Sequence, residues 1–434
     1  MKMQFINVPA DKFPDPWYMP LGQILLGNAI KDISDVEILD GTIISRKEIL
    51  NRIDADVVGI NYTTLSVKNI PEFVKVAKAK GSYVVFGGHA ATAEPLSLFE
   101  LPETDAVVVG SGETALRNLL ENKLNPSQSP NTYYRKNGQI IKPSKQIDDP
   151  LPHSFKSFSR HIHGLDVEKY LENYVKTTTF PHIVANRPMN ILSQKGCPER
   201  CSFCARYDKK IKRRNPKDVI DEINYLIDEY RIDYVFDTAD TWALGSKWID
   251  EFSQMYSPQI PMSIFANIRD ITLNKLDKMK KCGIENILFG IESGSEKILK
   301  SNGKRYSLQR IKDVVKQTTQ RGISVSGSFV IGLIGEDYKS LNETTQLIDE
   351  LSVNEKFHPY MNIIIPLPGS PLWKDFTMDK KFIDKYNNSL SYNLKETRSD
   401  FLNARTSVEL GDLRKVRDSL NLKAGLETQV EYAR

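Results

Sequence analysis

Cysteine is scarce in this chain, because only four of its 434 residues are cysteines. That number excludes a small secreted domain held together by disulfides, since such domains devote far more of their residues to cysteine. Three of the four fall within eight positions, at Cys197, Cys201 and Cys204, whereas Cys282 stands alone. Clustered thiols of this kind favour a metal site in a reducing compartment, so we expect the protein to be cytoplasmic.

The sequence also lacks long apolar stretches and a strong excess of either charge. Residues 323–335 form the most suggestive uncharged run, yet they are fewer than the roughly 20 residues that a membrane-spanning helix needs. Pro9 interrupts the N-terminal segment before an apolar core of signal-peptide length can form. Lys and Arg number 59 against 55 Asp and Glu, a net charge of +4, so no concentrated basic surface for phosphate is indicated. We therefore expect neither a membrane nor nucleic acid as a partner.

Strand-like and helix-like runs alternate in residues 1–122. The strand-like runs lie at 3–8, 36–39, 57–61, 83–86 and 106–109. This alternation predicts a doubly wound, Rossmann-like α/β domain with five parallel strands. At about 150 residues per domain, the length of the chain leaves room for one or two further domains.

The remaining sequence divides into three parts. Residues 123–185 interrupt the alternation and form a predicted connector, with a hairpin about the turn at Asn137 and Gly138. In residues 186–372 the alternation resumes, which predicts a partial, TIM-like (β/α) barrel of six strands. Residues 373–434 are charged and amphipathic, so we expect a mostly helical C-terminal extension with a last helix from residue 410 to about 432.

The cysteine cluster directly follows the first strand-like run of the second alternating region. Three residues separate Cys197 from Cys201, and two separate Cys201 from Cys204. Thiolates are soft ligands for iron or zinc, and this spacing allows one short loop to wrap around a metal centre. A structural zinc site normally needs four protein ligands, but His182 and Cys282 have no motif spacing to these three. An iron–sulfur cluster held by three thiolates would instead leave one iron open to a small molecule.

With the aromatic Phe203 directly before the third cysteine, this segment resembles the cluster loop of the radical S-adenosylmethionine enzymes. The resemblance implies that Cys197, Cys201 and Cys204 hold a 4Fe-4S cluster whose fourth iron binds S-adenosylmethionine. It further implies an external one-electron donor, such as flavodoxin or ferredoxin, and a 5′-deoxyadenosyl radical formed inside the barrel. A structural metal loop is the alternative.

The same resemblance supplies candidate contacts to S-adenosylmethionine where barrel strands end. They are Phe203, Asp237, Arg269, Glu292 and Ser328. Asp237 would meet the methionyl amino group, although the family's Gly-Gly-Glu is absent and capping of the following turn is the alternative. Arg269 would pair with the methionyl carboxylate unless it is a surface arginine. Glu292 would meet the ribose hydroxyls or the methionyl group, and Ser328 would lie along the adenine.

A doubly wound domain before such a barrel is the layout of the cobalamin-binding branch of this family. The resemblance implies that cobalamin binds to the loops after the strands and to the start of the first helix. The candidate residues are Leu21, Gly22, Asn61, Thr63, Thr64, Gly87, Gly88, His89, Gly110, Ser111, Gly112 and Glu113. There is no Asp-x-His-x-x-Gly motif, whose histidine binds the lower face of cobalt in other cobalamin proteins. The alternatives are a domain that kept the fold without the cofactor, and a helix-capping or solvent-facing role for His89.

Together these features predict a cobalamin-dependent radical S-adenosylmethionine methyltransferase. The 5′-deoxyadenosyl radical would remove hydrogen from a small molecule or a peptide, and methylcobalamin would donate methyl to the resulting carbon radical. A radical rearrangement or an oxidative ring formation, with cobalamin non-methylating or absent, is the alternative reaction. A protein that binds cobalamin or a cluster only to sense it is the alternative class. The sequence assigns no catalytic acid, base or hydrogen donor.

Overall fold

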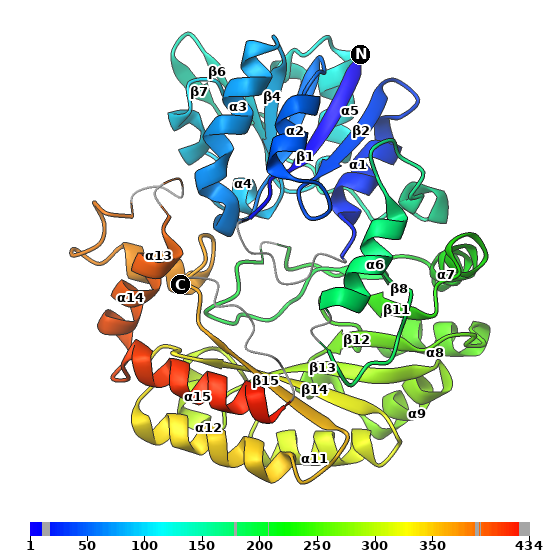
Figure 1. Ribbon diagram of the computed structural model, residues 1–434, viewed down its shortest axis with the longest axis vertical. Helices are drawn as coiled ribbons and strands as arrows, with labels where there is room; N and C mark the ends of the chain where they lie inside the picture. The colour runs from blue at the N-terminus through cyan, green and yellow to red at the C-terminus, as the bar shows by residue number, and fades with distance from the viewer. Residues whose placement is uncertain (11–17, 178–179, 207, 387–389, 391, 425–434) are drawn as a thin grey trace.

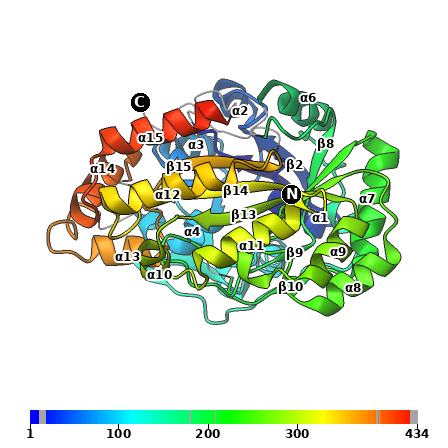
Figure 2. The same ribbon diagram turned by 90° about the horizontal axis from the view of Figure 1, so that it is seen from below.

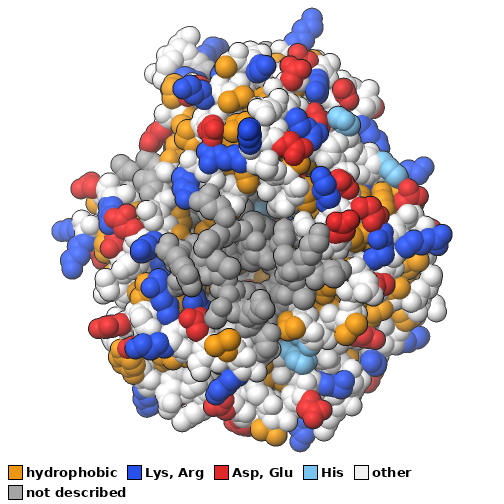
Figure 3. All heavy atoms as spheres, viewed as in Figure 1, with side chains coloured by type: hydrophobic (Ala, Val, Ile, Leu, Met, Phe, Trp, Pro, Cys, Tyr) orange, Lys and Arg blue, Asp and Glu red, His pale blue; other side chains and the backbone are white. Residues whose placement is uncertain are grey.

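The computed structural model describes residues 1–10, 18–177, 180–206, 208–386, 390 and 392–424. Figure 1 shows two α/β bodies, the N-terminal one in blue and cyan and the second in green and yellow, with the C-terminal helices in orange and red along one side. Within the described residues, no helix has both the length and the apolar character needed to cross a membrane. On the face of the molecule seen in Figure 3, Lys and Arg side chains are interspersed with Asp and Glu.

The N-terminal body contains one sheet with the strand order β2-β1-β3-β4-β5-β6-β7. Its strands are β1 (Lys2–Asn7), β2 (Asp35–Asp40), β3 (Val57–Asn61), β4 (Tyr83–Gly87), β5 (Ala106–Val108), β6 (Thr132–Lys136) and β7 (Gln139–Ile141). Strands β1 to β5 pair in parallel, which confirms the doubly wound prediction. The predicted hairpin is present as β6 and β7, and it pairs with β5 in antiparallel fashion. The sheet therefore continues beyond residue 122 into the segment that we expected to be a connector.

Helices cover both faces of this sheet, as nearly continuous apolar strands require. They are α1 (Leu21–Ile30), α2 (Arg46–Arg52), α3 (Ile70–Ala79), α4 (His89–Ala93) and α5 (Glu113–Glu121). In α5, Ala115, Leu116, Leu119 and Leu120 are buried, which is the spacing of one helix face packed against a sheet. Strand β3 is rich in β-branched residues and is buried on both faces.

The second body is an open barrel with the parallel strand order β15-β14-β13-β12-β11-β8, which confirms the partial-barrel prediction. Its strands are β8 (Pro188–Ile191), β11 (Tyr234–Asp237), β12 (Met262–Ala266), β13 (Ile284–Glu292), β14 (Ser324–Ile331) and β15 (Phe357–Ile363). The covering helices are α7 (Pro216–Tyr230), α8 (Ser246–Met255), α9 (Leu273–Lys281), α10 (Glu296–Ser301), α11 (Leu308–Thr319) and α12 (Tyr338–Leu351). Figure 2 shows these helices along the outer side of the strands.

Helices α13 (Pro371–Thr377), α14 (Leu394–Arg405) and α15 (Leu410–Lys423) form the C-terminal extension. The predicted last helix is present to residue 423, and its expected continuation from 425 lies outside the described residues. Asn421 of α15 binds the edge strand β15, because its Oδ1 accepts from Met361 N at 3.0 Å and its Nδ2 donates to Met361 O at 3.1 Å. Trp373 is buried against the rings of Phe376 and Tyr386, so it serves packing.

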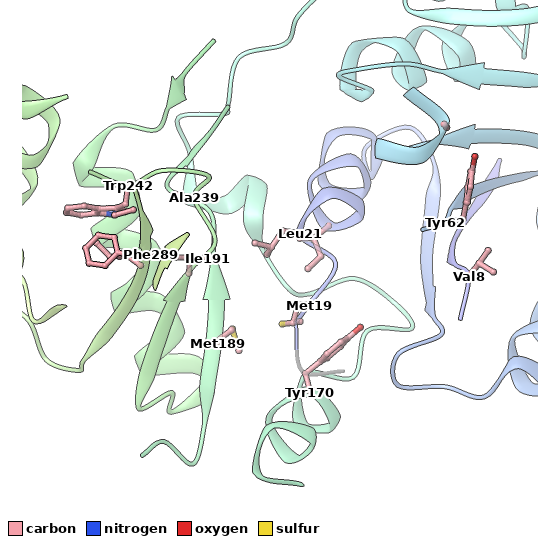
Figure 4. Close-up of a cluster of buried hydrophobic side chains, with 14 of the residues drawn as sticks. Val8, Met19, Leu21, Tyr62, Tyr170, Met189, Ile191, Ala239, Trp242 and Phe289 are labelled. Atoms are coloured by element: carbon pink, nitrogen blue, oxygen red, sulfur yellow. The ribbon is translucent and has the colours of Figure 1, made fainter. Parts of the chain in front are cut away.

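Several contacts join the two bodies. Asn190 of β8 exchanges hydrogen bonds with the backbone of Met19, which lies two residues before the start of α1. Figure 4 shows Met19 and Leu21 facing Met189 and Ile191 across this junction, with Tyr170 of α6 (Val167–Thr177) beside them. Because these side chains belong to one buried apolar cluster, the two bodies share a core.

Candidate functional site

A cavity of about 440 Å³ lies where the carboxyl ends of the N-terminal strands meet the barrel. Ligands of open α/β sheets bind at these strand ends. Ten of the twelve residues predicted for cobalamin line it: Leu21, Gly22, Asn61, Gly87, Gly88, His89, Gly110, Ser111, Gly112 and Glu113. Thr63 and Thr64 do not line this cavity, because they begin the short 3₁₀ helix Thr64–Asn69, and Thr63 N donates to Ser66 Oγ at 3.1 Å.

Apolar side chains form the inner wall of the cavity. Met3 and Phe5 of β1, Phe86 of β4 and Leu116 of α5 contribute to it. Gly88 has a φ of 91°, a conformation that favours glycine, and a Cβ at this position would collide with Asn61 Oδ1. The missing Cβ therefore makes room for the Asn61 side chain, and the wall itself suits a ligand with a large apolar surface.

The barrel supplies the opposite wall, with polar residues from loops next to the cysteines. Lys195, Arg206 and Asp208 line the cavity together with His89. The His89 ring is accessible from the cavity but surrounded by protein, so burial lowers its pKa to about 4, with a further contribution from Arg206 and Lys195. The imidazole is therefore neutral at pH 7. Burial also raises the pKa of Glu113. His89 thus lines the cavity at the start of α4 and is exposed there, and its contact with cobalamin stays a prediction.

The loop that carries the cysteines is held at its base and on both sides. Strand β9 (Gln194–Lys195) pairs with β10 (Lys212–Arg213), which closes the base of the loop. Cys197 N donates to Asp208 O at 3.1 Å. Ser202 Oγ donates to Asn302 Oδ1 at 2.8 Å, and Ser202 O accepts from Leu372 N at 2.8 Å. Segments 302–304 and 371–372 therefore fix the position of the loop.

The three predicted ligands are all free thiols. Burial raises the pKa of Cys201 to about 11, although the nearby Lys304 ammonium acts against this shift, and burial also raises the pKa of Cys197. These thiols become thiolates at neutral pH only when a cation replaces their protons. Within the described residues, no three His, Cys, Asp or Glu side chains converge on one metal ion. Three free thiols on one short loop are soft donors that suit an iron–sulfur cluster, and their role as its ligands stays a prediction.

Glu292 stands beside this loop in an unusual backbone conformation. Its φ is 72°, and the pairing of β13 with β14 shifts register between Gly290 and Glu292. Glu292 Oε1 lies 2.9 Å from Lys304 Nζ, and both side chains are 9% exposed. The same ammonium lies 5.9 Å from the centroid of the Phe203 ring. A left-handed glutamate is strained, so its occurrence at this strand end is typical of a functional position.

Sequence reasoning missed Lys304 and Tyr306. Lys304 Nζ donates to Gly290 O at 3.1 Å, and Tyr306 Oη donates to the same oxygen at 2.7 Å. Lys304 follows Gly303, whose left-handed turn packs against Arg200 of the cysteine loop. A lysine after a glycine turn is usually on the surface, so nothing in the local sequence indicated its burial.

The other predicted S-adenosylmethionine residues have contacts of their own. Asp237 is buried, and its Oδ1 accepts hydrogen bonds from Ser193 N and Ala239 N, each at 3.1 Å. The bond to Ala239, two residues later, is of the kind that the turn-capping alternative expects. Burial raises its pKa to about 6. Arg269 forms an ion pair with Glu199 of the cysteine loop. Ser328 is half-buried on β14, next to Gly290 of β13. Contact of these residues with S-adenosylmethionine stays a prediction.

A row of hydrogen-bonded polar side chains crosses the barrel strands nearer their amino ends. Tyr234 bonds Ser263 at 2.8 Å, and Asn286 Nδ2 donates to Ser263 Oγ at 3.2 Å. Ser326 Oγ lies 3.0 Å from Asn286 Oδ1 and 3.1 Å from His182 Nε2. The ring of His182 stacks on that of His358. These contacts link neighbouring strands at the end of the barrel opposite the cysteine loop.

We expect acid to destabilise the wild-type protein more than a His182→Gln variant. Burial, with a contribution from His358, lowers the pKa of His182 from 6.5 to about 4. Between these values the unfolded chain binds more protons than the folded chain, so stability falls as the pH falls. Thermal unfolding is measured at about pH 7 and at about pH 4.5. Between these pH values the free energy of unfolding of the wild-type protein should fall by roughly 1–2 kcal/mol more than that of the variant. Parallel pH profiles for the two proteins would contradict this assignment.

Two family models match the chain over the regions described above. Residues 18–120 match the B12 binding domain, and residues 191–348 match the radical SAM superfamily. The first match covers most of the residues that line the cavity, and the second begins at the last residue of β8 and includes the three clustered cysteines.

Among similar proteins, an uncharacterized methyltransferase from Pyrococcus horikoshii is 30% identical over 376 residues, which cover 82% of this chain and 78% of the relative. Cytidylyl-2-hydroxyethylphosphonate methyltransferase from Streptomyces wedmorensis is 27% identical, over 66% of this chain and 59% of the relative. Anaerobic magnesium-protoporphyrin IX monomethyl ester cyclase from Rubrivivax gelatinosus is 22% identical, over 78% and 62%. The chain thus spans between 59% and 78% of the length of these relatives.

Two solved structures share the fold. The radical S-adenosylmethionine methyltransferase TsrM from Kitasatospora setae, with cobalamin and a 4Fe-4S cluster bound, superimposes with a TM-score of 0.71 and 16% identity, over 87% of this chain and 76% of TsrM. The cobalamin-dependent S-adenosylmethionine radical enzyme OxsB, with aqua-cobalamin and S-adenosylmethionine bound, gives a TM-score of 0.65 and 15% identity, over 96% of this chain and 57% of OxsB.

Proposed function

Because this chain belongs to the radical S-adenosylmethionine enzymes that carry an N-terminal B12 binding domain, we propose that it is a cobalamin-dependent methyltransferase that acts on an unactivated carbon. Its cofactors are a 4Fe-4S cluster, S-adenosylmethionine and cobalamin. When bound, these groups supply a 5′-deoxyadenosyl radical for hydrogen abstraction and a methyl group for transfer. The substrate would be a small molecule or a peptide.

In this proposal, Cys197, Cys201 and Cys204 hold the cluster, and the residues that line the cavity hold cobalamin. Phe203 and the Glu292–Lys304 pair lie beside Cys201, where they would orient S-adenosylmethionine and exclude water. The apolar wall formed by Met3, Phe5 and Phe86 would exclude water around the corrinoid. A water-poor enclosure matters because a carbon radical reacts with whichever hydrogen donor it meets.

One observation carries the proposal: the wall of the cavity that faces the barrel is built from the ends of the cysteine loop. Lys195 lies two residues before Cys197, Arg206 lies two residues after Cys204, and both line the cavity. The methyl donor and the radical generator would therefore share one enclosure, as transfer between them requires. A protein that only senses cobalamin or a cluster has no need of this arrangement.

Ring formation is the second candidate reaction. The observation that favours it is the similarity of the chain to anaerobic magnesium-protoporphyrin IX monomethyl ester cyclases, which are 22% and 23% identical over 78% and 87% of this chain. In that case the hydrogen-abstraction step would remain, and no methyl group would move. For either reaction we propose a cytoplasmic enzyme with an external one-electron donor such as flavodoxin or ferredoxin, and without a nucleic-acid partner.

Anaerobic purification with hydroxocobalamin and reconstitution of the cluster would test the proposal. We expect the absorption spectrum to show stoichiometric corrinoid, and reductant to drive formation of both 5′-deoxyadenosine and S-adenosylhomocysteine from S-adenosylmethionine. Corrinoid with 5′-deoxyadenosine but without S-adenosylhomocysteine, once a substrate turns over, would replace methylation with the second candidate. Formation of 5′-deoxyadenosine by protein that binds no corrinoid would refute the cobalamin-dependent part.

A further inference from the structure

Three neighbouring strands of the N-terminal sheet end in polar residues that lie side by side. Asn7 of β1 is paired in register with Asp40 of β2 and with Asn61 of β3. Most other residues of these strands are apolar and buried. Asp40 is 1% exposed, and Tyr170 of α6, which is labelled in Figure 4, donates a hydrogen bond to its carboxylate. Buried polar groups require partners, so the directions of their hydrogen bonds are informative.

The contacts of Asp40 determine the direction of its hydrogen bond with Asn7. Its Oδ1 accepts from Thr42 N at 2.9 Å and from Asn7 Nδ2 at 2.9 Å, and its Oδ2 accepts from Tyr170 Oη. Because a backbone amide can only donate, the oxygen that faces Thr42 must be an acceptor. Asn7 must therefore turn its NH₂ group, and not its carbonyl oxygen, toward Asp40.

The orientation of the Asn7 amide in turn determines the orientation of the Asn61 amide. With its NH₂ group at Asp40, Asn7 directs Oδ1 toward β3, where it accepts from Asn61 Nδ2 at 3.0 Å. Asn61 Oδ1 then points toward Gly88, and only the absence of a Cβ at position 88 leaves room for it. Asn61 lines the cavity, and no residue of the described chain donates a hydrogen bond to its Oδ1. Asn7 is not among the residues that line the cavity.

We infer that Asn7 is a positioning residue that holds Asn61 with its side-chain oxygen toward the cavity, where this oxygen accepts a hydrogen bond from an amide N–H on the rim of the bound corrinoid. The inference rests on the proposed cobalamin site. Corrinoids carry primary carboxamides around the ring, so an acceptor fixed in place selects the N–H side of such a group. Without Asn7 nothing holds Asn61 in this orientation, and an Asn61 that turns its NH₂ group toward the cavity would not bind the N–H.

Equilibrium binding of hydroxocobalamin, followed by absorption, would test this role in three variants. Asn61→Leu removes the acceptor, and Asn7→Ser keeps a small polar group at position 7 but is too short to reach Asn61. We expect each to weaken binding by roughly five- to tenfold, as the loss of one hydrogen bond predicts. In the third protein, Asn7→Ser is combined with Asn61→Asp, whose two oxygens both accept, so orientation no longer matters. We expect its Kd to return to within about threefold of the wild-type value.

The rescue distinguishes positioning from a general structural role. If Asn7→Ser merely loosened the sheet, Asn61→Asp would not restore binding. Wild-type affinity in Asn7→Ser, or failure of the double variant to recover, overturns the inference. Iron content per chain and circular dichroism verify that each variant is folded. If the wild-type protein binds no hydroxocobalamin, the proposed cobalamin site itself is wrong. If the wild-type protein and all variants bind hydroxocobalamin with the same Kd, the site stands and only the role of Asn7 and Asn61 is wrong.

Discussion

A Cys201→Ser variant is expected to fold, to lack an intact iron–sulfur cluster, and to form no detectable 5′-deoxyadenosine. Three thiolates are the predicted ligands, and the fourth cysteine of the chain, Cys282, follows α9 and does not belong to the cysteine loop. Burial already raises the pKa of the Cys201 thiol to about 11, and a serine hydroxyl at the same place would ionise far less readily. Iron and sulfide content, the charge-transfer absorption of the cluster, and chromatography of 5′-deoxyadenosine measure the outcome.

Cys282 provides the matched control. It is a fully buried thiol that caps the C-terminal end of α9, and it lies outside the cysteine loop. A Cys282→Ala variant should lose about 1 kcal/mol of stability from its small cavity and keep the wild-type iron content. If Cys201→Ser retained a full cluster and wild-type formation of 5′-deoxyadenosine, or if Cys282→Ala lost the cluster, the assignment of ligands would be wrong.

Replacing Lys304 with methionine is expected to reduce the free energy of unfolding by about 3–5 kcal/mol, because the substitution leaves the Glu292 carboxylate buried without a cation. Both partners are 9% exposed, so water cannot compensate for the missing charge. The ammonium also interacts favourably with the Cys201 thiolate, so its loss should make loading of the cluster less complete. Chemical denaturation and iron content measure the two effects.

The double variant Lys304→Met/Glu292→Gln should recover most of this stability, since it contains no unpaired charge. An exposed ion pair of the same type provides the control. Lys297 of α10 lies 2.8 Å from Asp337, and these side chains are 60% and 38% exposed. Lys297→Met should therefore change stability by less than about 1 kcal/mol. Equal losses in Lys304→Met and Lys297→Met would show that Lys304 is not the buried partner of Glu292.

The sequence predicted those parts of the molecule that depend on local patterns. Strands and helices that alternate along the chain produce alternating patterns of apolar residues, so the two α/β bodies could be predicted from these patterns. The cysteine loop was found because its three ligands are close together in the chain. The loops after parallel strands lie at one edge of a sheet, which is why ten of the predicted cobalamin residues line one cavity.

Other features depend on contacts that no local pattern reveals. Lys304 becomes a buried partner of Glu292 only because segment 302–304 packs against the cysteine loop. Thr63 and Thr64 follow the strand that ends at Asn61, but the 3₁₀ helix that they begin does not line the cavity. At Asp237, two backbone amides bind Oδ1 of the carboxylate, whereas Oδ2 is buried without a hydrogen-bond partner among the described residues. The direction of a side chain at a loop depends on tertiary packing, which sequence periodicity does not report.

The contact between Asn421 and Met361 bears on the tendency of this protein to aggregate. A six-stranded open barrel ends in an edge strand, and unpaired N–H and C=O groups on such an edge can recruit a strand from another molecule. At Met361 the side-chain amide of Asn421 binds both groups, as the backbone of a seventh strand would. Helix α15 thereby gives β15 a neighbour that cannot extend the sheet. Detachment of this helix would expose a template for aggregation, so the C-terminal helix protects the solubility of a barrel that never closes.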